Sequence, residues 1–193
     1  MFSHKKFLLG IGLSMALVFP VLADQHQDEA ILVGEESFEC ITDMIPVRGF
    51  YVASLTDNLS ETILVANSSK GGKYPPGSIV QLIPGEAMVK RSEGTNPITH
   101  DWEFFELDVD ENGTKIRKRG YSDVTNRFGG NCFGCHVQAK PQWDLVCENN
   151  HGCQSIPLTD DMIRALQLSD PRCNPPNELG EVEKKLFKSL AMY

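Results

Sequence analysis

The sequence predicts an α+β fold, in which a mainly antiparallel β-sheet domain is flanked by N-terminal and C-terminal helices. Short segments rich in β-branched and aromatic residues, separated by turns of Gly, Pro and Asn, fill the middle of the chain. Amphipathic spacing with helix-start residues follows near the C-terminus. The chain has 193 residues, which is enough for one domain with its own hydrophobic core.

The N-terminal 23 residues have the order of a secretory signal peptide. A basic region at His4–Lys6 precedes an apolar run, and the small residue Ala23 offers a cleavage site before Asp24. The run from Phe7 to Leu22 is 16 residues long, which is short of the roughly 20 residues that a membrane span needs. We therefore expect cleavage, a periplasmic location and one mature domain over residues 24–193, with an uncleaved anchor as the alternative.

The charge of the chain excludes two classes of partner. The formal net charge is −8, and loss of Lys5 and Lys6 with the signal peptide makes it −10. Nucleic acids and anionic membranes both select clustered cations, so neither is an expected partner of the mature protein. The one basic cluster, Lys115 with Arg117–Arg119, is interpreted as a solvated face.

The predicted elements follow one another along the chain. A weak helical pattern over residues 28–43 ends before Pro46 and predicts an N-terminal helix. Asn112-Gly113 favours a tight hairpin turn, because both residues tolerate positive φ. The segments predicted as strands are residues 63–66, 78–83, 87–91, 102–109 and 114–118.

The chemically informative motif follows the last predicted strand. Cys132-Phe133-Gly134-Cys135-His136 is a C-x-x-C-H sequence, the attachment signature of c-type haem. This spacing presents two thiols to the vinyl groups on one edge of a porphyrin and places an imidazole next to the iron. The motif occurs once, so we expect one covalent haem c held by Cys132 and Cys135, with His136 as the proximal iron ligand.

The C-terminal part of the chain is predicted to be a helical extension of the domain. Thr159 is a good helix N-cap, and Asp160 and Asp161 favour the first turn of the helix that follows. Asp170-Pro171 ends this helix, and a last amphipathic helix is predicted from about Glu178.

The remaining four cysteines are expected to form disulfides, because export places them where disulfides persist. Four cysteines allow three pairings. We favour Cys147–Cys153, which closes a short loop, and Cys40–Cys173, which ties the two ends of the domain together. A zinc site is disfavoured because no two of the four form a C-x-x-C pair.

The second axial position of the iron has several candidates. Met88, Lys90, His100 and Met162 are the candidate distal ligands, and His151 is interpreted as solvent-facing in its disulfide loop. Met88 and Met162 lie on apolar faces and are better interpreted as core, and His100 as a surface residue. The alternative hypothesis is an open distal face lined by apolar side chains such as Phe104 or Phe105.

Several segments carry a family resemblance by their order and spacing. They are Tyr74 to Val80, Met88 to Lys90, Asp101 to Phe104 with the acidic turn over residues 110–113, Cys132 to His136, and Asp144 to Val146. From about Leu64 to Val146 the sequence resembles the cytochrome P-460 and cytochrome c′-beta family. The resemblance implies an antiparallel sheet with a few helices, one haem c on the late motif, and an open or weakly occupied distal face.

Members of this family divide in function. Some oxidise hydroxylamine or bind nitric oxide with a lysine cross-linked to the haem, and others bind small gases without that link. The strand after Gly77 has no lysine where the cross-linked branch would need one. Lys90 is the nearest lysine and is interpreted as an exposed strand residue.

Three functions remain in view. The first is an exported mono-haem cytochrome with an open or labile distal site that binds small diatomic or nitrogenous ligands such as NO or CO. The second is a periplasmic electron carrier with a Met or His sixth ligand and a basic redox partner. The third is an oxidoreductase acting on hydroxylamine or NO through a haem–lysine link. Whether the protein is an enzyme, and whether it forms a homodimer, stays open at this point.

Overall fold

The computed structural model describes residues 30–190. The predicted signal peptide, residues 1–23, lies outside the described residues. Within residues 30–190, no helix is both long and apolar enough to cross a membrane.

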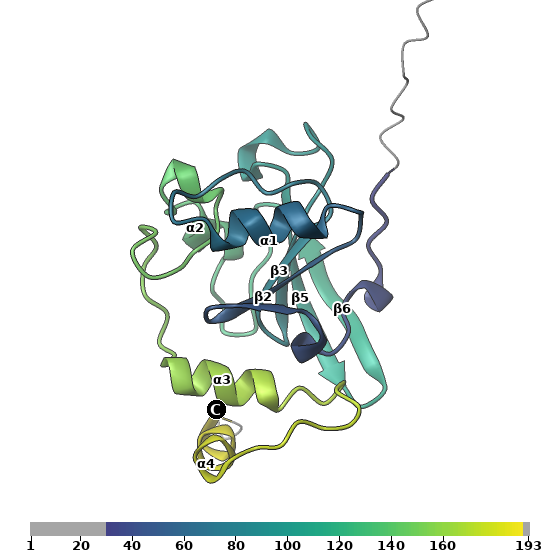
Figure 1. The fold of residues 1–193 in the computed structure, drawn as a ribbon, viewed down its shortest axis with the longest axis vertical. Helices are drawn as coiled ribbons and strands as arrows, with labels where there is room; N and C mark the ends of the chain where they lie inside the picture. Colours follow the sequence, from purple (N-terminus) through teal and green to yellow (C-terminus); the bar gives the residue numbers. More distant parts are fainter. Residues whose placement is uncertain (1–29, 191–193) are drawn as a thin grey trace, which may run out of the picture.

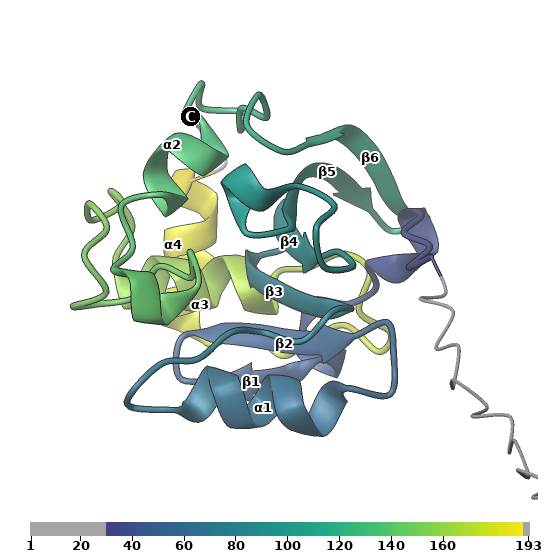
Figure 2. The ribbon, with the colours of Figure 1, turned by 90° about the horizontal axis from the view of Figure 1, so that it is seen from above.

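One antiparallel sheet organises the structure (Figures 1 and 2). Its six strands pair in chain order, so that each strand lies beside its sequence neighbour. The strands are β1 (Ile45–Val47), β2 (Phe50–Ser54), β3 (Ser78–Ile83), β4 (Glu86–Lys90), β5 (Trp102–Asp110) and β6 (Gly113–Gly120). With its helices this sheet confirms the α+β class. β3 has the predicted bounds. The predicted hairpin between β5 and β6 forms, but its two turn residues are Glu111 and Asn112 rather than Asn112 and Gly113, because Asp110 pairs with Gly113, the residue that has the positive φ.

The segment over residues 63–66 is not a strand, and that prediction is wrong. It belongs to α1 (Leu59–Asn67), which lies beside β1 and β2 (Figure 2). The burial pattern gives the reason. Thr62 and Ala66 are buried four residues apart, whereas Leu64 is exposed, and this is the periodicity of a helix rather than of a strand. The Thr62 hydroxyl lies 2.7 Å from that of Ser78 in β3 and attaches the helix to the sheet.

The predicted N-terminal helix is also absent from the described residues. The segment forms only two short 3-10 turns, η1 (Glu35–Ser37) and η2 (Ile41–Asp43). Apart from the bonds within these two turns, its backbone groups bond to side chains elsewhere in the chain. The Ile41 N–H donates to Asp170, and the Phe38 carbonyl accepts from Thr114. These long-range bonds hold the segment in an irregular path across the sheet.

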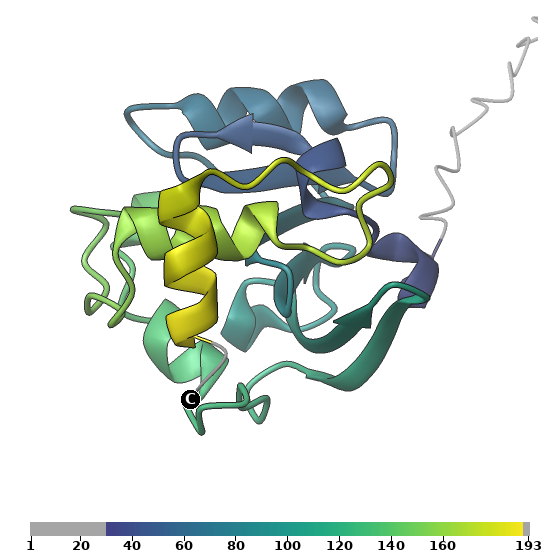
Figure 3. The same ribbon diagram turned by 90° about the horizontal axis from the view of Figure 1, so that it is seen from below.

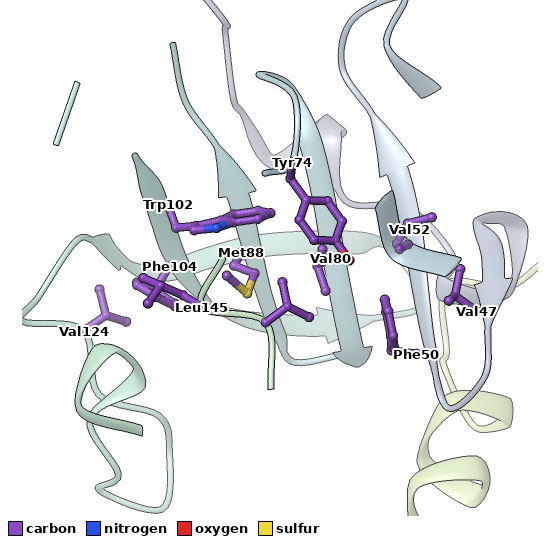
Figure 4. Packing of buried hydrophobic residues seen from close by; sticks show 12 residues of the cluster. Val47, Phe50, Val52, Tyr74, Val80, Met88, Trp102, Phe104, Val124 and Leu145 are labelled. Atoms are coloured by element: carbon purple, nitrogen blue, oxygen red, sulfur yellow. The ribbon is translucent and has the colours of Figure 1, made fainter. Parts of the chain in front are cut away.

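The two faces of the sheet carry separate cores. One core contains Phe38, Ile79, Ala87, Val89, Phe105 and Leu107, and the N-terminal segment covers it. The other, which we call the motif-side core, contains Val47, Phe50, Val52, Ala66, Tyr74, Val80, Met88, Trp102, Phe104, Val124, Leu145 and Val146. Figure 4 shows Trp102, Met88, Phe104 and Leu145 gathered on this face. Cys132 and Phe133 pack against it, so the sheet supports the attachment motif directly.

The C-terminal helices form as predicted. In α3 (Asp160–Leu168) the Thr159 side chain caps the N-terminus by accepting a hydrogen bond from the Met162 N–H. The last helix, α4 (Glu181–Leu190), packs against α3, and Figure 3 shows the two crossing. Gln167 anchors α3 to the sheet, because its amide donates to the carbonyls of Gly49 and Leu82 at 2.8 Å each.

Both favoured disulfides are present. Cys40 is bonded to Cys173, and Cys147 to Cys153, with sequence separations of 133 and 6 residues. The first disulfide joins the N-terminal segment to the chain that follows α3. The second closes a small loop shortly after the attachment motif.

The long-range disulfide is expected to stabilise the fold substantially. A Cys40→Ala/Cys173→Ala variant should lose about 2–4 kcal/mol of the free energy of unfolding, since the cross-link restricts the unfolded chain over a long loop. Urea unfolding followed by circular dichroism measures this loss. The control is Cys147→Ala/Cys153→Ala, which opens a much shorter loop and should cost less. An equal or greater loss in the control would contradict the prediction.

Candidate haem attachment site

The attachment motif forms its own helical turn, α2 (Cys132–His136). Asn131 caps this turn by accepting a hydrogen bond from the Gly134 N–H at 2.6 Å, and its amide donates to the Ser122 carbonyl at 2.9 Å. The Cys132 N–H donates to the Val124 carbonyl at 3.0 Å. These bonds fix the turn to the segment that precedes it, so both cysteines and His136 occupy defined positions.

The two thiols of the motif are available for covalent attachment. Among the described residues, which include all six cysteines, only Cys132 and Cys135 are not in disulfides, and both are half-buried. Burial, helped by Glu86 and Glu106, raises the pKa of Cys132 to about 12, and burial also raises the pKa of Cys135. Such thiols are protonated at neutral pH. A redox-active dithiol needs the opposite shift, toward the thiolate, so this environment argues against that alternative.

His136 is oriented by a single strong contact. Its Nδ1 lies 2.7 Å from the Leu145 carbonyl oxygen. A carbonyl can only accept, so Nδ1 carries the hydrogen and Nε2 keeps its lone pair in the neutral ring. Burial lowers the pKa of His136, which favours that neutral form. A metal-ligating histidine commonly donates its other ring N–H to a carbonyl in this way, so the geometry fits an iron ligand.

The Leu145 carbonyl is held in place by an unusual backbone. Asp144 and Leu145 have φ values of 48° and 65°, in the left-handed region that bulky residues rarely adopt. Each such residue costs about 1–3 kcal/mol. The Asp144 carbonyl accepts from Trp102 Nε1 at 2.7 Å, and the Asp144 carboxylate accepts from the Tyr74 N–H at 2.8 Å. Two buried elements of the motif-side core therefore fix this short segment.

Lys90 completes the support of Asp144, and its predicted exposure is wrong. Its side chain is 1% exposed, and Nζ lies 2.9 and 2.7 Å from the two carboxylate oxygens of Asp144. Nζ also lies 4.9 Å from the centre of the Trp102 ring. Lys90 shares a sheet face with Met88, two residues away, and this face is covered by the chain after the motif. Burial lowers the pKa of Lys90, and Asp144 opposes that shift.

Two carboxylates lie near the thiols, the buried Glu106 and the half-buried Glu86. Glu106 is fully buried and accepts from the backbone N–H and Nε of Arg127 at 3.0 and 3.1 Å. Its second oxygen, Oε2, has no hydrogen-bond partner among the described residues. Burial and the charge of Glu106 raise the pKa of Glu86. The sequence did not indicate that Glu86 and Glu106 are neighbours. They are opposite one another in β4 and β5, and the sequence predicts these strands without the register between them.

The other candidate ligands are found in three different settings. Met88 is buried in the motif-side core as expected, opposite Phe104, whose ring centre is 5.3 Å from that of His136. His100 is half-exposed, as expected, with Nδ1 3.4 Å from an Asp144 oxygen. Met162 lies half-buried on α3 and belongs to neither core, so its predicted core position is wrong. The structure thus brings Met88, Lys90 and His100 toward the chain around the motif, and it describes no contact of Met162 with it.

His151 differs from its predicted solvent-facing position. It is buried and stacked on Trp143, with ring centres 3.7 Å apart, and its Nδ1 lies 2.8 Å from the Val146 carbonyl. The Cys147–Cys153 loop therefore folds back onto the chain that supports His136.

A surface hollow of about 310 Å³ lies beside Asp144. Its lining consists of Lys73, Pro97, His100, Asp101, Pro141 and Asp144. Both carboxylates are already engaged: Asp101 accepts from the Gly94 and Asn96 N–H groups, and Asp144 from Lys90 and Tyr74. The hollow thus reaches the same ion pair that supports the His136 contact.

Cys40, Asp170 and Cys173 lie close enough together to resemble a metal site among the described residues. The two sulfurs form a disulfide, and Asp170 accepts hydrogen bonds from Arg172 and from the Ile41 N–H. These contacts use the donor atoms that a metal ion would need. The cluster is structural.

No family model matches the chain, and no curated protein or solved structure matches it significantly. The resemblance to the cytochrome P-460 and cytochrome c′-beta family therefore stays a prediction.

Proposed function

We propose that this protein is an exported mono-haem c-type cytochrome, in which Cys132 and Cys135 form the thioether bonds and His136 is the proximal ligand. The contact between His136 Nδ1 and the Leu145 carbonyl carries this proposal, since it leaves Nε2 as the ligating nitrogen. The two uncommitted thiols on the same helical turn support it. A dithiol role would leave this histidine geometry without a purpose, and Cys132, Cys135 and His136 do not form a metal-binding cluster of their own among the described residues.

The chain contributes anchoring, orientation and exclusion of water. A bound haem c would supply ligand binding and electron transfer at its iron. The thioether bonds would fix the porphyrin edge, and the Leu145 carbonyl would orient the imidazole. The apolar motif-side core, including Phe104 beside His136, would exclude water from the proximal ligand.

We further propose that the distal position is open or easily vacated and binds a small ligand such as NO or CO. Three candidate ligands have other partners: Lys90 and His100 lie against Asp144, and Met88 is packed in the core. A haem–lysine link through Lys90 would require this side chain to abandon a buried carboxylate. That cost weighs against the hydroxylamine-oxidising alternative.

Carbon monoxide tests the proposed distal site. Purified ferrous protein is expected to have a high-spin absorption spectrum that CO converts to a sharp low-spin one. A low-spin spectrum that CO leaves unchanged would contradict the proposal and favour the electron carrier. In that case one of the single variants Met88→Leu, His100→Ala and Met162→Leu should become high-spin, which would identify the sixth ligand.

A further inference from the structure

The proximal histidine is connected to a buried ion pair by an unbroken series of contacts. His136 Nδ1 donates to the Leu145 carbonyl, and Leu145 follows Asp144 directly. The Asp144 side chain is bonded to Lys90, and its main-chain carbonyl to Trp102. Resting on the proposed function, we infer that Lys90, Asp144 and Trp102 are positioning residues that aim the Leu145 carbonyl at His136 and so set the electron donation of the proximal ligand.

The backbone conformation explains why such support is needed. Asp144 and Leu145 both lie in the left-handed region, at φ 48° and 65°. A leucine adopts this conformation only when its surroundings impose it. Without the support, relaxation of the two residues toward ordinary backbone angles would rotate the Leu145 carbonyl away from Nδ1. The series of contacts therefore acts through geometry, with no contact between the ion pair and the imidazole itself.

The contacts around Asp144 are sufficient to impose that conformation. Its carboxylate accepts from Lys90 Nζ through both oxygens and from the Tyr74 N–H, and its carbonyl accepts from Trp102. Lys90 and Trp102 are opposite one another in adjacent strands β4 and β5. The anchor is thus two paired strands of the sheet, which is a rigid platform on which to mount a loop.

The hydrogen bond that this platform maintains would act on a bound haem iron through the imidazole ring of His136. A carbonyl that accepts from Nδ1 makes the imidazole a stronger electron donor through Nε2. Stronger donation stabilises the oxidised iron and strengthens the bond between iron and histidine. Loss of the positioning contacts should therefore weaken that bond and raise the reduction potential.

The chain offers a matched control for the ion pair. Asp170 is buried like Asp144 and accepts two hydrogen bonds from the Arg172 side chain. It also accepts from two backbone N–H groups, those of Ile41 and Arg172, where Asp144 accepts from one, that of Tyr74. It lies beside the Cys40–Cys173 disulfide, away from the motif. Asp144→Asn and Asp170→Asn thus make the same chemical change in similar settings, and asparagine tolerates the left-handed backbone at position 144.

The test uses haem-loaded ferrous protein and two readouts other than activity. Resonance Raman spectroscopy reports the iron–histidine stretching band, and redox titration gives the midpoint potential. In Asp144→Asn we expect a lower band frequency and a reduction equilibrium shifted about tenfold toward the reduced state, which is about 59 mV for a one-electron couple. Asp170→Asn should keep the parent's band and potential, even though it lowers the thermal midpoint.

Trp102→Phe is the second variant and decides the outcome if Asp144→Asn fails to fold. It removes the hydrogen bond to the Asp144 carbonyl and keeps an aromatic ring, and it should shift both readouts in the same direction. Haem-loaded Asp144→Asn or Trp102→Phe protein with the parent's band and potential overturns the inference, as does an equal shift in Asp170→Asn. A parent protein without haem refutes the proposed function instead, so the two failures are distinguishable.

Discussion

A Cys132→Ala/Cys135→Ala variant is expected to contain no covalently bound haem, whereas the parent protein keeps its pigment through acid–acetone extraction. Alanine has no sulfur with which to form a thioether bond, and the other four cysteines are in disulfides. Both proteins are exported in cells that have a working haem-ligation apparatus. Intact-mass spectrometry and the absorption of the pyridine complex measure the covalent haem.

The control for this loss is Cys147→Ala/Cys153→Ala, which also removes two sulfurs close to the motif. It opens the small loop after the motif and should keep its covalent haem, because neither sulfur belongs to the attachment turn. Covalent pigment in the Cys132→Ala/Cys135→Ala protein, or a colourless parent protein, would contradict the attachment.

Replacement of Lys90 by methionine is expected to lower the free energy of unfolding by about 3–5 kcal/mol. Methionine fills the volume of the lysine stem, but it leaves the buried Asp144 carboxylate without its counter-charge. Breaking a buried ion pair from one side usually costs this much. Urea unfolding at neutral pH, followed by tryptophan fluorescence, measures the change.

Two further variants show whether the charge is the cause. Lys90→Met/Asp144→Asn removes both charges and should recover part of the loss, so that the two substitutions are not additive. Lys73→Met breaks a comparably short ion pair, 2.9 Å long, with Glu93, but both partners are largely exposed. It should leave the unfolding curve unchanged. A small effect of Lys90→Met, or a double variant as unstable as the sum of the single ones, would contradict the prediction.

Local sequence patterns predicted the parts of this structure in which local chemistry decides the conformation. Asn112-Gly113 marks a hairpin because glycine accepts the positive φ that Gly113 adopts, and Thr159 caps α3 through its own side chain. The disulfide pairing was also favoured from the sequence, because one pair closes a short loop and the other joins the chain ends.

The errors occur where long-range contacts decide the structure. The β-rich residues of α1 form a helix because Thr62 and Ala66 must meet the sheet on one side. Lys90 is buried because Asp144, 54 residues later, returns to neutralise it. No local pattern indicates a partner at that separation. The attachment motif could be found from its spacing, but the carbonyl that orients its histidine could not.

The separation between Lys90 and Asp144 has a consequence for the order in which the molecule assembles. The six strands pair with their chain neighbours and need only nearby sequence, so the sheet can form before residues 132–146 fold onto it. Until residues 144–146 dock, the Lys90 ammonium group lies without its counter-charge on a sheet face that is buried in the final structure. The docking step removes that electrostatic penalty and, in the same movement, brings the Leu145 carbonyl to His136. Closure of the hydrophobic interior and orientation of the His136 imidazole are therefore one cooperative event.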